Sequence, residues 1–139
     1  KLIKVNTYNI EDMVKYFIKD LMMSTIGRKL TEKEGKVFSL LQKSDIETSF
    51  ETLESGVLAK SFGMGNDNLI KIKVDPVMWE KSSNQKRWYI IYHELGHDVL
   101  NFNHGYGGRM MFNFVDKQYS WDDFFTDRKN MFDYFFKTL

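Results

Sequence analysis

The sequence predicts an α+β fold in which helices flank a small twisted sheet. Apolar residues recur every three or four positions near both ends of the chain, as on helices that bury one face, and they alternate with polar residues in the middle, as in strands. The only proline is Pro76, and no linker-like or low-complexity tract interrupts the 139 residues. We therefore expect one domain spanning residues 1–139.

Two helices are expected before the sheet. Apolar positions in residues 9–25 have helical spacing, and Gly27 is a stop signal after them. Thr31 and Glu34 have the spacing of a capping box, which predicts a second, shorter helix that runs to about Lys43.

Three strands are expected in the middle of the chain. Residues 46–50 alternate between apolar and polar, residues 57–62 do so weakly between glycines, and residues 68–74 do so clearly. The dipeptide that follows, Asp75-Pro76, should end the third strand.

Two longer helices are expected after the sheet. Ser82 and Gln85 have capping-box spacing, which predicts a helix over residues 84–101. Ser120 and Asp123 predict the start of a last helix that runs towards the C-terminus and buries a phenylalanine-rich face.

Composition excludes several classes of partner and site. The formal net charge is only +1, with 20 basic and 19 acidic residues interspersed, so no nucleic-acid partner is expected. No apolar run approaches the roughly 18 residues of a transmembrane segment. Cysteine is absent, so a metal would have to use imidazole, carboxylate or carbonyl ligands.

The strongest motif is His93-Glu94-Leu95-Gly96-His97, an H-E-x-x-H pattern on the predicted helix of residues 84–101. Residues four apart lie on the same helical face, so His93 and His97 can bind one ion, and Zn²⁺ accepts such nitrogen ligands. Glu94 is adjacent, where it can act as general base towards a zinc-activated water.

The third metal ligand is expected to be His104. The chain has only three histidines, and all of them lie in residues 93–104. A turn after the helix can bring His104, seven positions beyond His97, back to the metal. The alternative is a surface role for His104, with a carboxylate such as Asp116 or Asp122 as the third ligand.

Other polar residues allow two interpretations each. Asp98 and Asp116 are candidates for orienting a ligating imidazole, and the alternative is a solvated carboxylate. Tyr106 and Tyr119 are candidates for donating a hydrogen bond to an oxyanion, and the alternative is a partly buried structural tyrosine.

Residues 93–104 resemble the active-site helix of metzincin-type zincins, and most closely that of small Bacteroidetes metallopeptidases with H-E-L-G-H-x-x-L and a histidine seven positions further on. Residues 107–112 resemble the Met-turn that lies beneath the metal in metzincins. The resemblance implies that Met111 fills this place, with Met110 as the alternative. It extends from the strand at 69–74 to the C-terminus, about half of the chain.

The chain departs from the usual metzincin pattern at two positions. That pattern has glycine where this chain has Leu100, and it has its third histidine where this chain has Asn103. A helix one residue longer before the turn would absorb the shift and still present His104.

The resemblance implies a zinc-dependent peptidase, an endopeptidase rather than an exopeptidase, that acts as a monomer on a peptide or protein. It implies an edge strand within residues 56–63 that pairs with the substrate. It also implies an extracytoplasmic location, meaning secreted, periplasmic or lipid-anchored after removal of a leader.

Two alternatives stay open at this point. The first is a repressor-cleaving, immunity-region type of peptidase, which also carries H-E-L-G-H but uses an acidic third ligand. The second is a catalytically inactive metal-binding domain that interacts with a partner. Glu94 argues against the second, because a structural metal site needs no base.

Overall fold

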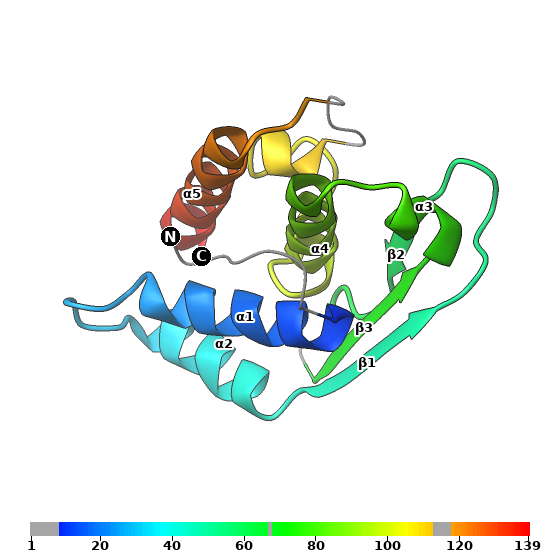
Figure 1. Ribbon diagram of the computed structural model, residues 1–139. Coiled ribbons are helices and arrows are strands. Elements are labelled where there is room, and N and C mark those ends of the chain that lie inside the picture. Colours follow the sequence, from blue (N-terminus) through cyan, green and yellow to red (C-terminus); the bar gives the residue numbers. More distant parts are fainter. Residues whose placement is uncertain (1–8, 67, 113–117) are drawn as a thin grey trace.

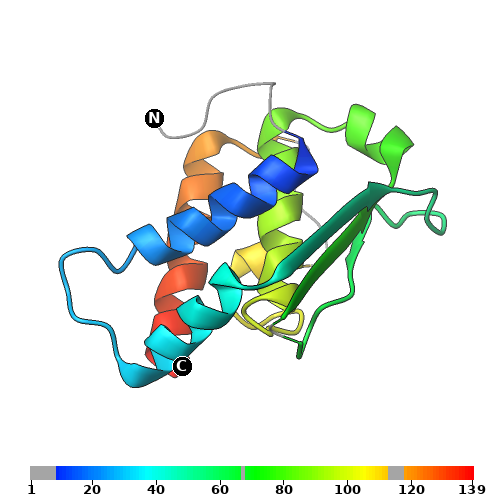
Figure 2. The same cartoon turned by 90° about the horizontal axis from the view of Figure 1, so that it is seen from below.

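The computed structural model describes residues 9–66, 68–112 and 118–139. These residues form a mixed α and β fold, compatible with the expected α+β class. Helix α4 lies between the sheet on one side and α5 on the other (Figures 1 and 2). The elements in chain order are α1 (Ile10–Met23), α2 (Glu32–Gln42), β1 (Asp45–Phe50), β2 (Ala59–Ser61), β3 (Leu69–Val74), α3 (Pro76–Glu80), α4 (Asn84–Asp98), the 3₁₀ turn η1 (Arg109–Met111) and α5 (Trp121–Thr138).

The sheet has three strands in the order β1-β3-β2, with β3 in the centre. Strand β3 is parallel to β1 and antiparallel to β2. Its alternation buries Ile70, Ile72 and Val74 and turns Lys71 and Lys73 outward, as the sequence pattern predicts. The prediction of an edge strand within residues 56–63 is confirmed, because β2 forms one edge of the sheet.

Helix α4 is enclosed by the rest of the fold. It packs against α1, both β2 and β3, η1 and α5. Such a helix is apolar on most of its surface rather than on a single stripe. Neither α4 nor any other described helix is long and apolar enough to cross a membrane. Ten of the fifteen residues of α4 are buried: Trp88, Tyr89, Ile90, Ile91, Tyr92, His93, Glu94, Leu95, Gly96 and Asp98.

A buried polar network fixes α4 relative to the helices around it. The Tyr92 hydroxyl of α4 donates to Asp20 of α1 at 2.6 Å. Arg128 of α5 donates to both oxygens of the same carboxylate, at 2.6 and 2.5 Å. The ring of Phe17 meets Tyr92 edge to face, with 4.9 Å between centroids. One carboxylate on α1 thus binds side chains from two other helices.

The capping boxes predicted at Thr31 and Ser120 are present. The capping box predicted at Ser82 is absent: Ser83 is the N-cap of α4, and its side chain accepts the Lys86 N–H. The Ser82 hydroxyl instead donates to the Met78 carbonyl of α3 at 2.8 Å. Two adjacent serines therefore close one helix and open the next.

Helix α3 and strand β2 differ from the sequence-based expectation. Helix α3 was not predicted: Pro76 is its first residue, and the Asp75 side chain accepts the N–H groups of Val77 and Met78. Strand β2 covers only Ala59–Ser61, which is shorter than the predicted 57–62.

We predict that Arg128→Met lowers the free energy of unfolding by about 3 kcal/mol, because it leaves a buried carboxylate without its charged partner. Chemical denaturation at pH 7 measures this. The control is Lys129→Met, which removes an exposed cation from the next position of α5. Equal losses in the two variants would contradict a stabilising role for the Asp20 network.

Candidate metal centre

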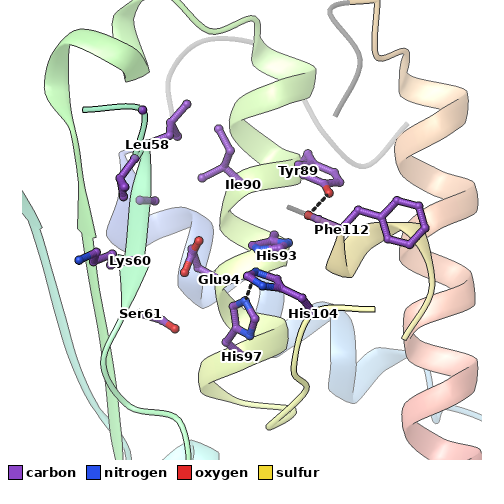
Figure 3. A pocket seen from close by; sticks show the side chains of 13 residues that line it. Leu58, Lys60, Ser61, Tyr89, Ile90, His93, Glu94, His97, His104 and Phe112 are labelled. Carbon is purple, nitrogen blue, oxygen red and sulfur yellow. Dashed lines mark hydrogen bonds between the residues drawn. The ribbon is translucent and has the colours of Figure 1, made fainter. Parts of the chain in front are cut away.

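The structure brings the three predicted histidines together. His93 and His97 project from α4, and His104 comes from the loop that follows it (Figure 3). One potential ligand atom from each residue lies within 4.8 Å of the others. The Nε2 atoms of His97 and His104 are 3.1 Å apart. Among the described residues, no other group of three histidines or carboxylates is close enough to hold a metal ion.

Backbone carbonyls orient two of the imidazoles. Nδ1 of His93 lies 2.7 Å from the Met110 carbonyl, and Nδ1 of His97 lies 2.6 Å from the Phe102 carbonyl. A carbonyl can only accept, so each Nδ1 carries the proton. Each Nε2 therefore keeps a lone pair for a metal.

The return of His104 depends on an early end of α4. The predicted end at residue 101 is wrong, because the helix ends at Asp98. The N–H groups of Val99 and Leu100 both donate to the Leu95 carbonyl, at 2.8 and 3.2 Å. Asn101 then adopts a left-handed conformation with φ of 60°, the only described non-glycine residue with positive φ. The longer helix that was expected to present His104 is therefore not observed, and a turn presents it instead.

The turn η1 contacts His93, α4 and the residue after His104. Met110 supplies the carbonyl for His93, and the Gly105 N–H beside His104 donates to the Met111 carbonyl at 3.1 Å. The Met111 side chain packs against α4 at Gly96, where an added Cβ would lie 2.3 Å from its Sδ. Both methionines are fully buried, so Met111 contacts the helix with its side chain and Met110 holds a histidine with its backbone.

Tyr89 is a site residue that the sequence analysis missed. It lies four residues before His93, and its ring stacks on that imidazole at 5.8 Å and 25°. Its hydroxyl donates to the carbonyls of Arg109 and Phe112, at 3.1 and 2.9 Å. Tyr89 therefore joins α4 to both ends of η1. Its position one helical turn from a predicted ligand was the available signal.

The three histidines line a groove between β2 and α4 (Figure 3). Residues 56–61 form one wall, α4 forms the other, and Phe112 also lines the groove. The cavity volume is about 410 Å³. A groove that has a sheet edge as one wall and is lined by three imidazoles can receive an extended chain beside a bound metal ion.

Burial shifts the pKa values of the groups in this groove. It lowers the pKa of His93 to about 4 and also lowers the pKa of His97. Both imidazoles are therefore neutral at pH 7, as metal ligands must be. Burial raises the pKa of Glu94 to about 7, although hydrogen bonding from the Ser61 side chain and backbone opposes this.

The other candidates lie elsewhere. Asp122 is exposed on α5 and does not join the histidine cluster, and Asp116 lies outside the described residues. Asp98 neither orients an imidazole nor lies in solvent: it is buried and accepts hydrogen bonds from the sheet. Tyr119 is buried and donates to Asp127 at 2.7 Å, as a structural tyrosine does, whereas Tyr106 is exposed.

Comparisons with protein-family models, with curated proteins and with solved structures find no match for this chain. The functional interpretation therefore depends on the residues and geometry of the groove.

We predict that His104→Ala weakens zinc binding at least about 100-fold, because it removes one of the three clustered imidazoles. Competition with a chelator dye measures the affinity, and elemental analysis measures the occupancy. Tyr106→Ala, an exposed neighbour, should bind zinc as the wild type does. Unchanged affinity in His104→Ala would transfer the third position to a carboxylate.

We predict that His93 makes the metal-free protein less stable in acid. Its pKa in the folded state lies below the unfolded value of 6.5, so this contribution is complete above pH 6.5 and is lost as pH falls towards 4. Glu94, with a raised pKa, acts in the opposite direction over this range. The informative measurement is therefore a comparison of two proteins by denaturation in chelator at pH 7 and pH 4. The wild type should lose up to about 3 kcal/mol more than His93→Gln, and equal losses would contradict the lowered pKa.

Proposed function

We propose that this protein is a zinc-dependent peptidase of the metzincin type, which hydrolyses peptide bonds within an extended substrate. One observation carries the proposal: three convergent imidazoles lie beside a buried glutamate, in a groove whose opposite wall is a sheet edge. Each feature has a separate task in peptide hydrolysis, namely to hold a metal, to move a proton and to bind a main chain.

The ligand set fits zinc. Catalytic zinc sites have three protein ligands and one open position, and three neutral imidazoles meet this requirement. His104 is exposed, so the cluster is accessible from the groove. Zinc bound there would polarise the scissile carbonyl and make a water molecule acidic near neutral pH.

Glu94 is the proposed general base. A carboxylate whose pKa is about 7 is suited to accept a proton from water and to return it at the same pH. Its oxygen atoms face the groove between β2 and the histidines (Figure 3). The same carboxyl group then delivers the proton to the leaving amine.

The edge of β2 is the proposed binding site for the substrate main chain. An extended peptide that adds to this edge would form backbone hydrogen bonds and would run along the groove past the histidines. This mode of binding demands little of the substrate side chains and suits an endopeptidase that acts on unfolded segments.

Two features support the metzincin type. A tight turn with two buried methionines packs under the histidine helix, at the position where the resemblance implies a Met-turn. The metzincin pattern has glycine where this chain has Leu100, and the left-handed residue of this chain is Asn101, one position later. The third histidine, His104, also lies one position later than in that pattern. A single inserted residue in the turn accounts for both departures.

The alternatives have less support. A peptidase with an acidic third ligand would not need His104 in the cluster. The Nε2 atoms of His104 and His97 nevertheless lie 3.1 Å apart. A structural metal site would not need a desolvated glutamate beside it. No specific observation favours either alternative.

We predict that Glu94→Gln retains zinc but cleaves unfolded casein at least about 100-fold more slowly than the wild type, because proton transfer is lost while the ligands remain. Fluorescein-labelled casein with and without a chelator reports cleavage, and elemental analysis reports zinc. Glu80→Gln, an exposed carboxylate on α3, is the matched control. Full activity in Glu94→Gln would exclude Glu94 as the base, and no chelator-sensitive cleavage by the wild type would refute the proposed function.

A further inference from the structure

The proposed peptide-binding strand is too short to fix its own position. Strand β2 has only three residues and pairs with β3 alone. A strand of this length contributes few ladder hydrogen bonds. The width of the groove between β2 and α4 must therefore be set by contacts outside the sheet ladder.

The register of β2 shows which main-chain groups face the groove. The Leu58 carbonyl accepts the N–H of Asp75, just beyond β3, and the Phe62 N–H donates to the Lys71 carbonyl of β3, at 2.8 Å each. In an antiparallel ladder, the residues between such positions direct their N–H and C=O groups towards the opposite edge. Ala59 and Ser61 are such residues, and both line the groove. The Ser61 N–H already bonds to Glu94, so the backbone groups of Ala59 and the Ser61 carbonyl are the ones that a peptide strand would meet.

Strands β2 and β3 and the loop between them form a hairpin, and Asp98 connects α4 to both sides of it. Asp98 is the last residue of α4, follows His97 directly and is only 1% exposed. Its Oδ2 accepts the N–H of Gly63, just beyond β2, at 2.9 Å, and the N–H of Lys71 in β3 at 3.1 Å. A buried carboxylate at the end of α4 therefore bonds to both sides of the hairpin, in addition to the hydrogen bonds of Ser61 with Glu94.

Neighbouring residues show that this contact is close. A Cβ at Gly63 would lie 2.3 Å from Oδ1 of Asp98 and 2.1 Å from the Leu69 carbonyl, so only glycine fits there. Three residues after Asp98, Asn101 accepts the N–H of Gly65 at 2.7 Å. The hairpin is thus attached to the same turn that returns His104 to the cluster.

We propose that Asp98 is a positioning residue for peptide binding: it holds the edge of β2 at the distance from α4 at which an added peptide strand passes over the three histidines. This inference rests on the proposed function, because it requires a peptide as the ligand. Asp98 acts through β2 and touches neither metal nor substrate.

The test measures binding apart from cleavage. Zinc-loaded Glu94→Gln protein is titrated with fluorescein-labelled unfolded casein, and anisotropy gives the dissociation constant. Asp98→Ala in this background should weaken binding about tenfold, with zinc content unchanged. Asp98→Asn should remain within about threefold, because its amide oxygen can accept both N–H groups. Asp133→Asn, at an exposed position of α5, is the control.

Steady-state kinetics in the otherwise wild-type protein give a second readout. Asp98→Ala should raise KM about tenfold and change kcat less than about twofold. A role in stability alone would reduce the amount of folded protein and leave KM unchanged. If Asp98→Ala does not fold, Gly63→Ala displaces the hairpin from the opposite side, retains the carboxylate and should raise KM in the same way.

The outcomes distinguish failure of this inference from failure of the proposed function. Amide exchange of the hairpin reports the loss of the Asp98 contacts whether or not the protein cleaves casein. Faster exchange with unchanged KM and unchanged casein affinity would overturn the positioning role and leave the peptidase intact. Binding that depends on Asp98, without any cleavage by the wild type, would refute the peptidase but support the positioning role. Absence of casein binding would overturn the inference.

Discussion

The enclosure of α4 between the sheet and α5 is the constraint on which the candidate site depends. A helix that is packed on most sides cannot rotate, and the hydrogen bonds of Asp20 with Tyr92 and Arg128 fix its rotation further. The part that faces the groove carries His93, Glu94 and His97. Two candidate ligands and the proposed base on one rigid helix would need no rearrangement to act together in the proposed reaction.

The position of the third candidate ligand, His104, depends on where this helix ends. If α4 continued in regular geometry, seven residues would carry His104 about 10 Å along the axis from His97. The shared Leu95 carbonyl and the left-handed Asn101 reverse the chain instead. The turns that follow also provide the carbonyls of Phe102 and Met110 that orient the imidazoles. The site is therefore built from a regular helix and from irregular backbone packed against it.

The sequence could predict those parts of the fold that follow from local patterns. Helical periodicity, two of the capping boxes and the alternation in β3 are each properties of a few neighbouring residues. The histidines could be paired because their spacing matches one helical turn. The end of α4 could not be predicted, because Val99 and Leu100 continue its apolar pattern while the chain already turns. The roles of Asp98, Tyr89 and the two orienting carbonyls arise from contacts between distant segments, which leave no local pattern.

The position of β2 has two consequences that cannot be separated. Glu94 is buried beside Ser61 of the opposite wall, and this desolvation is the main cause of its raised pKa. The same wall presents the main-chain groups that a peptide strand would bind. A wider groove would therefore weaken strand pairing and also hydrate the carboxylate. A buried carboxylate costs free energy unless it is hydrogen-bonded, and Oδ2 of Asp98 accepts two N–H groups of the hairpin. The resulting contact joins the wall to the residue next to His97, so a displacement of the hairpin at this point would act directly on the helix that carries two of the three clustered histidines.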